Sequence, residues 1–414
     1  MRINCPLMGL LVQKFGGTSV GDPDRIRAVA DHIAWCRRNG DQVVVVVSAM
    51  GKETDDLLRM AAAVASDPPG REMDVLITAG ERKAMSLLSM ALHEQGVPAQ
   101  SFTGSQAGIL TDTDHTNAKI LEITPERIQA ALDSGAVAVV GGAQGVSTDR
   151  NITFLGRGGS DTTAVALASA LDADVCELYT DVSGVYTADP RIVPRASKMS
   201  HVSFDDLMEM TATGCPKPAM RSVEFALRHH VPLHIRSAFT WEQGTWVTEE
   251  ETSMEKAIVT AVTHDTSEAK ITVSGVPDQP GIAAQVFRRL ASGNVNVDMI
   301  VQNSSANGVT DISFTVPKGE LNQSLALTEE VSSELSATGV SEDNDIARVS
   351  LVGSGMRSNP GVAALMFETL ADAGVNIEMI STSPIRTSCV VRAVDIERAV
   401  KLLHTAFDLD QPVG

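Results

Sequence analysis

The stretch FLGRGGSDTTAVALASALDADVCELYTDVSGV, residues 154–185, contains the pattern that decides the fold of the first half of the chain. Three glycines follow an apolar pair, so the backbone can turn sharply before a helix, with Ser160 and Asp161 as the expected caps. Small and apolar residues predict this helix over 162–171, and an apolar run predicts a buried strand over 175–179. This succession of elements is typical of an α/β protein with a parallel sheet.

The glycine turn of this stretch is expected to bind an anion. Unpaired N–H groups and the positive dipole end of the helix favour a phosphate or a carboxylate, and Arg157 adds a full charge at the rim. The next strand exits at Thr180-Asp181, where ligands collect in open α/β sheets, beyond the carboxyl ends of the strands. Glycines that only allow tight packing would give the same pattern, so both interpretations stay open on this stretch alone.

Two more predicted strands end in glycine-rich exits. Lys14 precedes Gly16-Gly17 after a short apolar strand, and a strand over 136–140 runs into GGAQG at 141–145. A lysine beside paired glycines suits a triphosphate, because backbone N–H groups can approach the oxygens while the ammonium offsets their charge. The sequence lacks both G-x-x-x-x-G-K-[ST] and G-x-G-x-x-G, which argues against P-loop and dinucleotide-binding Rossmann proteins.

The remaining elements of the first half extend the same pattern. A helix is predicted over 23–38, a strand buried on both faces over 42–47, and a long helix over 71–95. Repetition of strand, polar or glycine exit and helix predicts an α/β/α sandwich with a mostly parallel sheet. The first domain is expected to close near Gly244, before an acidic connector at 249–253.

Length and composition exclude several classes of protein. A chain of 414 residues suggests two or three domains. With 52 acidic against 33 basic residues the net charge is −19, which argues against nonspecific binding to nucleic acid or to an anionic membrane. The five cysteines show neither C-x-x-C nor metal-ligand spacing, so a reducing cytoplasm is expected. No apolar run is long enough to span a bilayer.

The second half of the chain contains an internal repeat. The segment PGIAAQVFRRLA at 280–291 is answered by PGVAALMFETLA at 360–371, and NVDMI at 296–300 by NIEMI at 376–380. An offset of 80 residues indicates a duplicated domain. In each copy a strand ends at Pro-Gly, a helix follows with apolar residues at core spacing, and a further strand comes next. This unit resembles the ligand-binding ACT module, although a duplicated domain that binds no ligand would show the same sequence pattern.

Five motifs together resemble aspartate kinase over essentially the whole chain. They are KFGGTS at 14–19, GER at 80–82, SFTG at 101–104, GRGGSD at 156–161 and YTADPR at 186–191. The resemblance implies an amino-acid-kinase domain over 1–245, a linker over 246–267, and two α+β ACT domains of ferredoxin-like fold over 268–343 and 344–414. It also implies transfer of the ATP γ-phosphoryl group to the β-carboxylate of L-aspartate with Mg²⁺, the first step of the aspartate-family amino-acid pathway.

The resemblance also implies roles for individual residues. The implied catalytic residues are Lys14, Arg157 and Asp161. The implied nucleotide-binding residues are Lys14, Gly16, Gly17, Ser19, Thr180, Asp181, Tyr186, Asp189, Arg191 and Lys217. The implied aspartate-binding residues are Ser48, Thr54, Glu81, Arg157 and Ser160. Arg157 would take the α-carboxylate and Glu81 the ammonium, and no metal ligand of the protein is implied. A carboxylate is already a nucleophile at neutral pH, so placement and electrostatics would suffice for catalysis.

The ACT repeats imply feedback regulation by threonine, lysine or both. The implied effector-binding residues are Asp278, Ile300, Gln302, Asn303, Asn376, Ile377 and Thr382. The resemblance is to the actinobacterial-type enzyme, in which an internal start yields a separate regulatory subunit, and Met254 stands where that start would be. A homodimer or a heterotetramer is therefore expected.

One loop departs from the family pattern. The usual Gly-Ala-Lys-Val reads GCPKP at 214–218, so the lysine is displaced by one residue and flanked by prolines, which fix the backbone. This departure suggests a specialised paralogue. It also leaves open a catalytically weak amino-acid-sensing regulatory protein. Glu81 with Arg157 and the paired ACT modules weigh against another member of the superfamily, such as a glutamate or acetylglutamate kinase.

Overall fold

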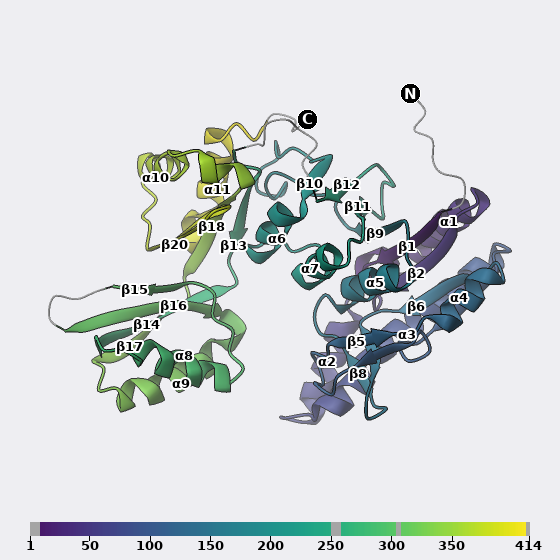
Figure 1. The fold of residues 1–414 in the computed structure, drawn as a ribbon, viewed down its shortest axis with the longest axis horizontal. Coiled ribbons are helices and arrows are strands. Elements are labelled where there is room, and N and C mark those ends of the chain that lie inside the picture. The colour runs from purple at the N-terminus through teal and green to yellow at the C-terminus, as the bar shows by residue number, and fades with distance from the viewer. Residues whose placement is uncertain (1–8, 250–257, 304–307, 411–414) are drawn as a thin grey trace.

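The computed structural model describes residues 9–249, 258–303 and 308–410 (Figure 1). The expected internal start at Met254 lies outside these described residues. The first half of the chain contains the strands β1 (Leu10–Phe15), β2 (Gln42–Val47), β3 (Ala99–Phe102), β4 (Ile109–Thr111), β5 (Ile120–Ile123), β6 (Val137–Gly141), β7 (Gln144–Ser147), β8 (Ile152–Phe154), β9 (Val175–Thr180), β10 (His201–Ser203), β11 (Leu233–Ser237) and β12 (Thr245–Thr248). Its helices are α1 (Pro23–Arg38), α2 (Glu53–Val64), α3 (Gly70–Glu94), α4 (Glu126–Asp133), α5 (Gly159–Ala170), α6 (Phe204–Ala212) and α7 (Met220–Arg228).

An eight-stranded sheet forms the centre of this first half, in the order β10-β12-β11-β9-β1-β2-β6-β3. The strands from β11 to β3 pair in parallel, and β12 runs antiparallel to β11. The valine run of β2 lies in the middle of the sheet with all five valines buried, as expected for a strand covered on both faces. Helices α1 and α3 pack on one face, and α4 to α7 pack on the other. The predicted α/β/α sandwich is confirmed.

The start of α5 differs from the expectation that Ser160 and Asp161 cap it. The helix begins at Gly159, and its N-cap is Gly158, with a left-handed φ of 74° and no side-chain cap hydrogen bond. Ser160 and Asp161 thus lie in the first turn. Glycine is suited to this cap because a Cβ at Gly158 would be 2.4 Å from the Cβ of Ala219.

The second half contains two four-stranded sheets with helices on one face of each. The strands are β13 (Ala261–Asp265), β14 (Glu268–Pro277), β15 (Ile300–Gln302), β16 (Val309–Pro317), β17 (Gly339–Asp343), β18 (Ile346–Val352), β19 (Met379–Ser383) and β20 (Arg386–Arg392). The helices are α8 (Ile282–Ser292), α9 (Leu321–Glu334), α10 (Val362–Asp372) and α11 (Ile396–Ala406). The first sheet has the order β15-β16-β14-β17 and the second β13-β18-β20-β19. We call these two sheets with their helices the first and second ACT units.

The expected linker over 246–267 is wrong at both of its ends. Residues Thr245–Thr248 form β12 and belong to the large sheet. Residues Ala261–Asp265 form β13, which pairs antiparallel with β18 in the second ACT unit. The second ACT unit therefore begins before the first in the chain, and its expected span of 344–414 omits one strand. The repeat does not reveal this, because β13 lies outside both copies of the repeated pattern.

Arg348 joins all three parts of the molecule. It lies on β18 in the second ACT unit and is 2% exposed. Its guanidinium contacts Asp298 and, at 3.0 Å, Glu268, both in the first ACT unit. It also donates a hydrogen bond of 3.1 Å to the carbonyl of Ala212 in α6. Because its charge is surrounded by fixed partners, Arg348 holds the ACT units against the kinase region.

Among the described residues, no helix combines the length and the apolar character that crossing a membrane requires.

Candidate active site

Lys14 and Asp161 form a buried ion pair at the carboxyl end of the central strands. Lys14 comes from β1 and Asp161 from the first turn of α5, and the ammonium lies 2.5 Å from the carboxylate. The second carboxylate oxygen of Asp161 accepts a hydrogen bond of 3.2 Å from the backbone N–H of Ala219. Lys14 and Asp161 are 8% and 7% exposed. An ammonium held by a single carboxylate keeps donors for an incoming anion.

The glycines of the strand exits bring this site together by close packing. A Cβ at Gly17 would lie 2.7 Å from the carbonyl of Ala49, and one at Gly142 would lie 2.6 Å from Oγ of Ser160. The N–H of Gly142 donates to the carbonyl of Val47, so this glycine does not offer a free donor. Tight packing at Gly17 and Gly142 places the exits of β1, β2 and β6 beside α5, and the phosphate-binding role of Gly17 stays a prediction.

Glu81 lies in α3 next to the exit of β2 and is 3% exposed. Gly80 allows this approach, because a Cβ there would lie 2.8 Å from the Cβ of Ala49. Burial raises the pKa of Glu81 to about 7, and the charge of Glu53 adds to the rise, while backbone hydrogen bonds and Arg82 oppose it. Its Oε2 atom has no hydrogen-bond partner. A buried carboxyl group with a free oxygen is suited to receive a cationic group.

The other expected aspartate-binding residues come from the exit of β2, the start of α2, and the start of α5 with the loop before it. Ser48 follows β2, and its N–H donates to the carbonyl of Phe15 at the end of β1. Thr54 lies in the first turn of α2. Ser160 is buried in the first turn of α5, and Arg157 is exposed in the glycine loop before it. The roles of these four residues in aspartate binding stay predictions.

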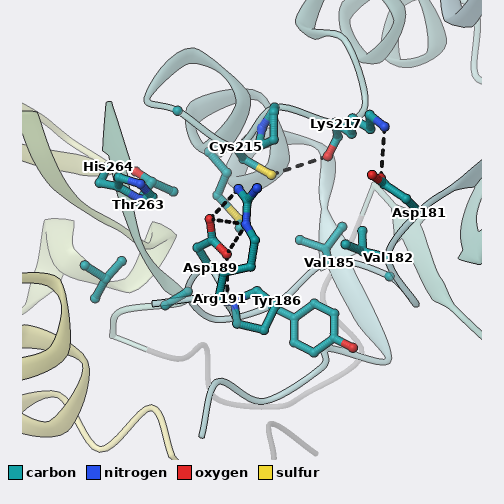
Figure 2. Close-up of a pocket in the computed structure, with 17 residues that line it drawn as sticks. Asp181, Val182, Val185, Tyr186, Asp189, Arg191, Cys215, Lys217, Thr263 and His264 are labelled. Carbon is teal, nitrogen blue, oxygen red and sulfur yellow. Dashed lines mark hydrogen bonds and ion pairs between the residues drawn. The ribbon is translucent and has the colours of Figure 1, made fainter. Parts of the chain in front are cut away.

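A pocket of about 560 Å³ lies beyond the end of β9. It is lined by the expected nucleotide residues Asp181, Tyr186, Asp189, Arg191 and Lys217 (Figure 2). Asp189 and Arg191 form an ion pair of 2.7 Å within it. The expected phosphate-binding residues Gly16 and Ser19 lie at the end of β1, the strand that pairs in parallel with β9. A volume of this size is in the usual range for a small-molecule site.

The displaced lysine of the GCPKP loop reaches this pocket. Nζ of Lys217 donates a hydrogen bond of 2.9 Å to Oδ1 of Asp181. Burial alone would raise the pKa of Asp181, but the hydrogen bond and the charge of Lys217 outweigh this effect and lower it. The thiol of Cys215 contacts the carbonyl of Lys217 at 3.3 Å. The loop therefore presents its lysine to the pocket in spite of the two prolines.

Sequence reasoning missed the part of the pocket that lies in the second ACT unit. Val262, Thr263 and His264 of β13 line it together with Met210 of α6. Only the pairing of β13 with β18 reveals this wall, and no local motif marks it.

The expected effector residues fall into two groups, one in each ACT unit. Ile300 and Gln302 lie on β15, the edge strand of the first sheet, and Ile300 is 52% exposed. Thr382 lies on β19, the edge strand of the second sheet, with Asn376 and Ile377 just before it. Asp278 follows the end of β14, and Asn303 follows the end of β15. Exposed edge strands can accept another chain or a ligand, and the structure leaves the effector roles as predictions.

The described residues contain no group of three or more histidine, cysteine, aspartate or glutamate side chains that could hold a metal ion. Mg²⁺ in nucleotide sites is typically bound by phosphates, waters and one or two carboxylates, so such a cluster is not required. Asp181 is a carboxylate that lies in the pocket and fits this arrangement.

The fold and the site define an amino acid kinase with regulatory ACT domains. The amino acid kinase family pattern matches residues 9–237, and the ACT domain pattern matches residues 261–331 and 349–407. The aspartokinases of Mycolicibacterium smegmatis and Corynebacterium glutamicum are 52% and 50% identical to this chain, each over 97% of both chains. The chain belongs to the aspartokinase family.

Solved structures agree with this assignment. Aspartokinase III of E. coli, in complex with aspartate and ADP in the R-state, has a TM-score of 0.81 at 25% identity and covers 96% of this chain and 99% of its own. The same enzyme with lysine and aspartate in the T-state has a TM-score of 0.75 at 26% identity, with the same coverage.

Proposed function

We propose that this protein transfers the γ-phosphoryl group of ATP to the β-carboxylate of L-aspartate. The observation that carries the proposal is the arrangement of the buried Lys14–Asp161 pair between two separate regions, the pocket at Asp181 and the corner at Glu81. One region is suited to a nucleotide and the other to a substrate with an ammonium group. The E. coli relative was solved with aspartate and ADP, which fits both.

In the proposed reaction Glu81 binds the ammonium of aspartate and Arg157 binds its α-carboxylate. The β-carboxylate then points toward Lys14 and attacks the γ-phosphorus, and ADP leaves. No general base is needed, because the attacking carboxylate is ionised at neutral pH. Placement of the two anions in line and the charge of Lys14 lower the barrier.

Asp161 would act as a positioning residue in this scheme. Its carboxylate fixes the ammonium of Lys14, and its second oxygen binds the backbone of Ala219 in the loop that follows Lys217. Asp181, a carboxylate of the pocket, would help to hold Mg²⁺, which would supply positive charge to offset that of the phosphates. Glu81, Arg157 and Lys14 would hold and orient the two substrates.

We also propose regulation by threonine, lysine or both through the ACT units. The T-state structure of E. coli aspartokinase III contains lysine, which supports an amino-acid effector. The exposed edge strands β15 and β19 are suited to pairing with a second chain, so we propose at least a dimer, either homomeric or with a regulatory subunit started near Met254. A reaction that consumes ATP favours a cytoplasmic location.

The experiment is ADP release by the purified protein with MgATP, with and without L-aspartate, repeated with threonine, lysine and both. Aspartate-dependent turnover that an effector suppresses would support both proposals. A protein that releases no ADP but is stabilised by threonine or lysine would instead be an amino-acid sensor. The contact of Lys217 with Asp181 weakens that alternative, because its support was the displaced lysine.

A further inference from the structure

The far wall of the nucleotide pocket is part of the second ACT unit. Val262, Thr263 and His264 of β13 line the pocket. β13 pairs with β18 along its whole length, from Ala261 opposite Val352 to Asp265 opposite Arg348. The pocket thus has one set of walls from the kinase domain and one from a strand that is fixed in a regulatory sheet.

The loop that carries Lys217 rests on this strand. Oγ1 of Thr213 and Oγ1 of Thr263 are hydrogen-bonded at 2.6 Å. Gly214 follows with a left-handed φ of 116°, and a Cβ there would lie 1.8 Å from the carbonyl oxygen of His264. A residue with a side chain could not approach β13 so closely, so the loop packs directly on the strand.

A second segment of the pocket is also attached to the ACT unit. The N–H of Val262 donates a hydrogen bond of 2.8 Å to the carbonyl of Thr187. Ala188 and Val193 are buried in the hydrophobic core of the second ACT unit. The pocket residues between them, Asp189 and Arg191, are therefore positioned by that unit as well.

His264 and Lys217 lie at opposite ends of the pocket (Figure 2). The Lys217 end is the phosphate end, because Asp181 follows β9, which pairs with the strand that carries Lys14. A nucleotide whose phosphates reach toward Lys14 would extend its nucleoside part along the pocket in the direction of His264.

We infer that His264 is a nucleotide-binding residue, which contacts the nucleoside part of bound ATP and makes the nucleotide site a composite of the kinase domain and the second ACT unit. This inference rests on the proposed function in so far as ATP is the ligand of the pocket. Burial lowers the pKa of His264 by more than the charge of Asp189 raises it, so the imidazole is neutral near pH 7. A neutral imidazole can donate one hydrogen bond and accept another, and a purine nucleoside offers partners for both.

A composite site links nucleotide binding to the regulatory sheet. A ligand that contacts β13 stabilises the conformation of β13 and β18 to which it binds. By linkage, a ligand of the second ACT unit that shifts β13 changes the affinity for nucleotide by the same factor as the nucleotide changes the affinity for that ligand.

The test is calorimetric binding to the full chain, without aspartate, of ADP, adenosine and inorganic tripolyphosphate. H264A is compared with wild type and with the matched control H201A, which removes an exposed histidine from β10 outside the pocket. Loss of one hydrogen bond weakens binding by about 5-fold, and loss of two by about 30-fold. We expect this loss for ADP and adenosine with H264A, unchanged tripolyphosphate binding, and no change with H201A. An ADP affinity within twofold of wild type, or an equal loss for tripolyphosphate, would overturn the inference.

A second measurement does not depend on the folding of a variant. Amide hydrogen exchange of the wild-type chain is followed with and without ADP. We expect ADP to slow exchange in β13 and in its partner β18, and unchanged exchange there would overturn the inference.

Failure of the inference can be told apart from failure of the proposed function. ADP release with aspartate is measured on the same preparations. Absence of turnover together with ADP binding that depends on His264 would refute the kinase reaction and retain the inference. Normal turnover together with ADP binding that does not depend on His264 would refute the inference alone.

Discussion

The charged side chains at the two ends of the candidate active site differ in their exposure to solvent. At the aspartate end Glu81 is 3% exposed, and Lys14 in the centre is 8% exposed. At the nucleotide end the side chains of Lys217 and Asp181 are 38% and 48% exposed. Charges interact strongly where water is excluded and weakly where it screens them. Single substitutions should therefore have large effects at the buried end and small effects at the exposed end.

The two ends also differ in the domains that form them. The aspartate end consists of strand exits and helices of the kinase domain alone, locked by glycine contacts. The nucleotide end is shared with the second ACT unit through β13. A buried end that belongs to one domain suits a fixed chemical step, whereas an exposed end between two domains suits adjustment of binding.

The largest effect is expected for Lys14. K14M removes the charge that offsets the repulsion between ATP and the aspartate carboxylate, and it leaves Asp161 without its partner. We expect kcat to fall by about 10³-fold or more, as when a preorganised charge at a phosphoryl group is lost. Initial rates of ADP release measure the change.

Two variants separate this loss from unfolding. K401M removes an exposed lysine from α11 and should keep wild-type kcat. K14M/D161N removes both buried charges and should regain melting temperature over K14M without regaining activity. Activity of K14M within tenfold of wild type would show that Lys14 is not at the reacting phosphoryl group.

The second effect is expected for Glu81 and concerns aspartate alone. E81Q keeps the shape of the side chain but cannot become negative, so the ammonium of aspartate loses a buried counter-charge. We expect KM for aspartate to rise by about 100-fold while KM for ATP stays within twofold. Equal changes in both KM values would contradict the assignment of Glu81 to the aspartate end.

The pH dependence of Glu81 provides an independent check. Its folded pKa of about 7 lies above the usual value, so its contribution to stability is complete below about pH 4.5 and is lost as the pH rises through 7. Aspartate binds the ionised form, so its affinity should rise with pH up to about 7 and then level off. In E81Q the pH dependence of aspartate affinity should be absent and the loss of stability with pH should be smaller, with a remainder from Glu268, whose pKa burial also raises to about 7. Thermal melts and aspartate titrations from about pH 4.5 to 8 measure both.

The kinase sheet could be predicted from the sequence for a physical reason. The kinase sheet follows from local signals, such as the valine run of β2 and the glycine exits, because each of these acts within a few residues of the chain. The buried contact of Lys14 with Asp161 joins residues far apart in sequence, yet both stood in recognisable motifs. The capping roles expected of Ser160 and Asp161 were wrong, since Gly158 adopts the left-handed cap and leaves the Asp161 carboxylate to Lys14.

The role of β13 could not be read from the sequence. A five-residue strand without a motif could pair in either ACT unit or in neither, and register and partner are set by tertiary packing. The repeat even suggested the wrong boundary, because it placed both ACT units after residue 267. Pocket residues such as His264 became visible only when β13 was placed beside β18.

A small effect is expected for Lys217 at the exposed end. K217A removes a half-exposed ion pair with Asp181, and such pairs contribute little because solvent screens them. We expect KM for ATP to rise by about 5-fold, with kcat and KM for aspartate within twofold of wild type. A fall in kcat like that of K14M would show that Lys217 belongs to the chemical step and that the contrast between the two ends is wrong.

The smallest effect is expected when the lysine is returned to the position that the family pattern prefers. In P216K/K217V the lysine stands one residue earlier in the loop, while Gly214 still packs the loop against β13. Because Lys217 already contacts Asp181, the shift should change KM for ATP by about threefold and leave aspartate kinetics unaltered. Steady-state kinetics of the two proteins side by side measure this. Indistinguishable kinetics would mean that the loop compensates fully for its prolines and would remove the sequence basis for a specialised paralogue, whereas a change of tenfold or more would show that the position of one exposed lysine controls the nucleotide end.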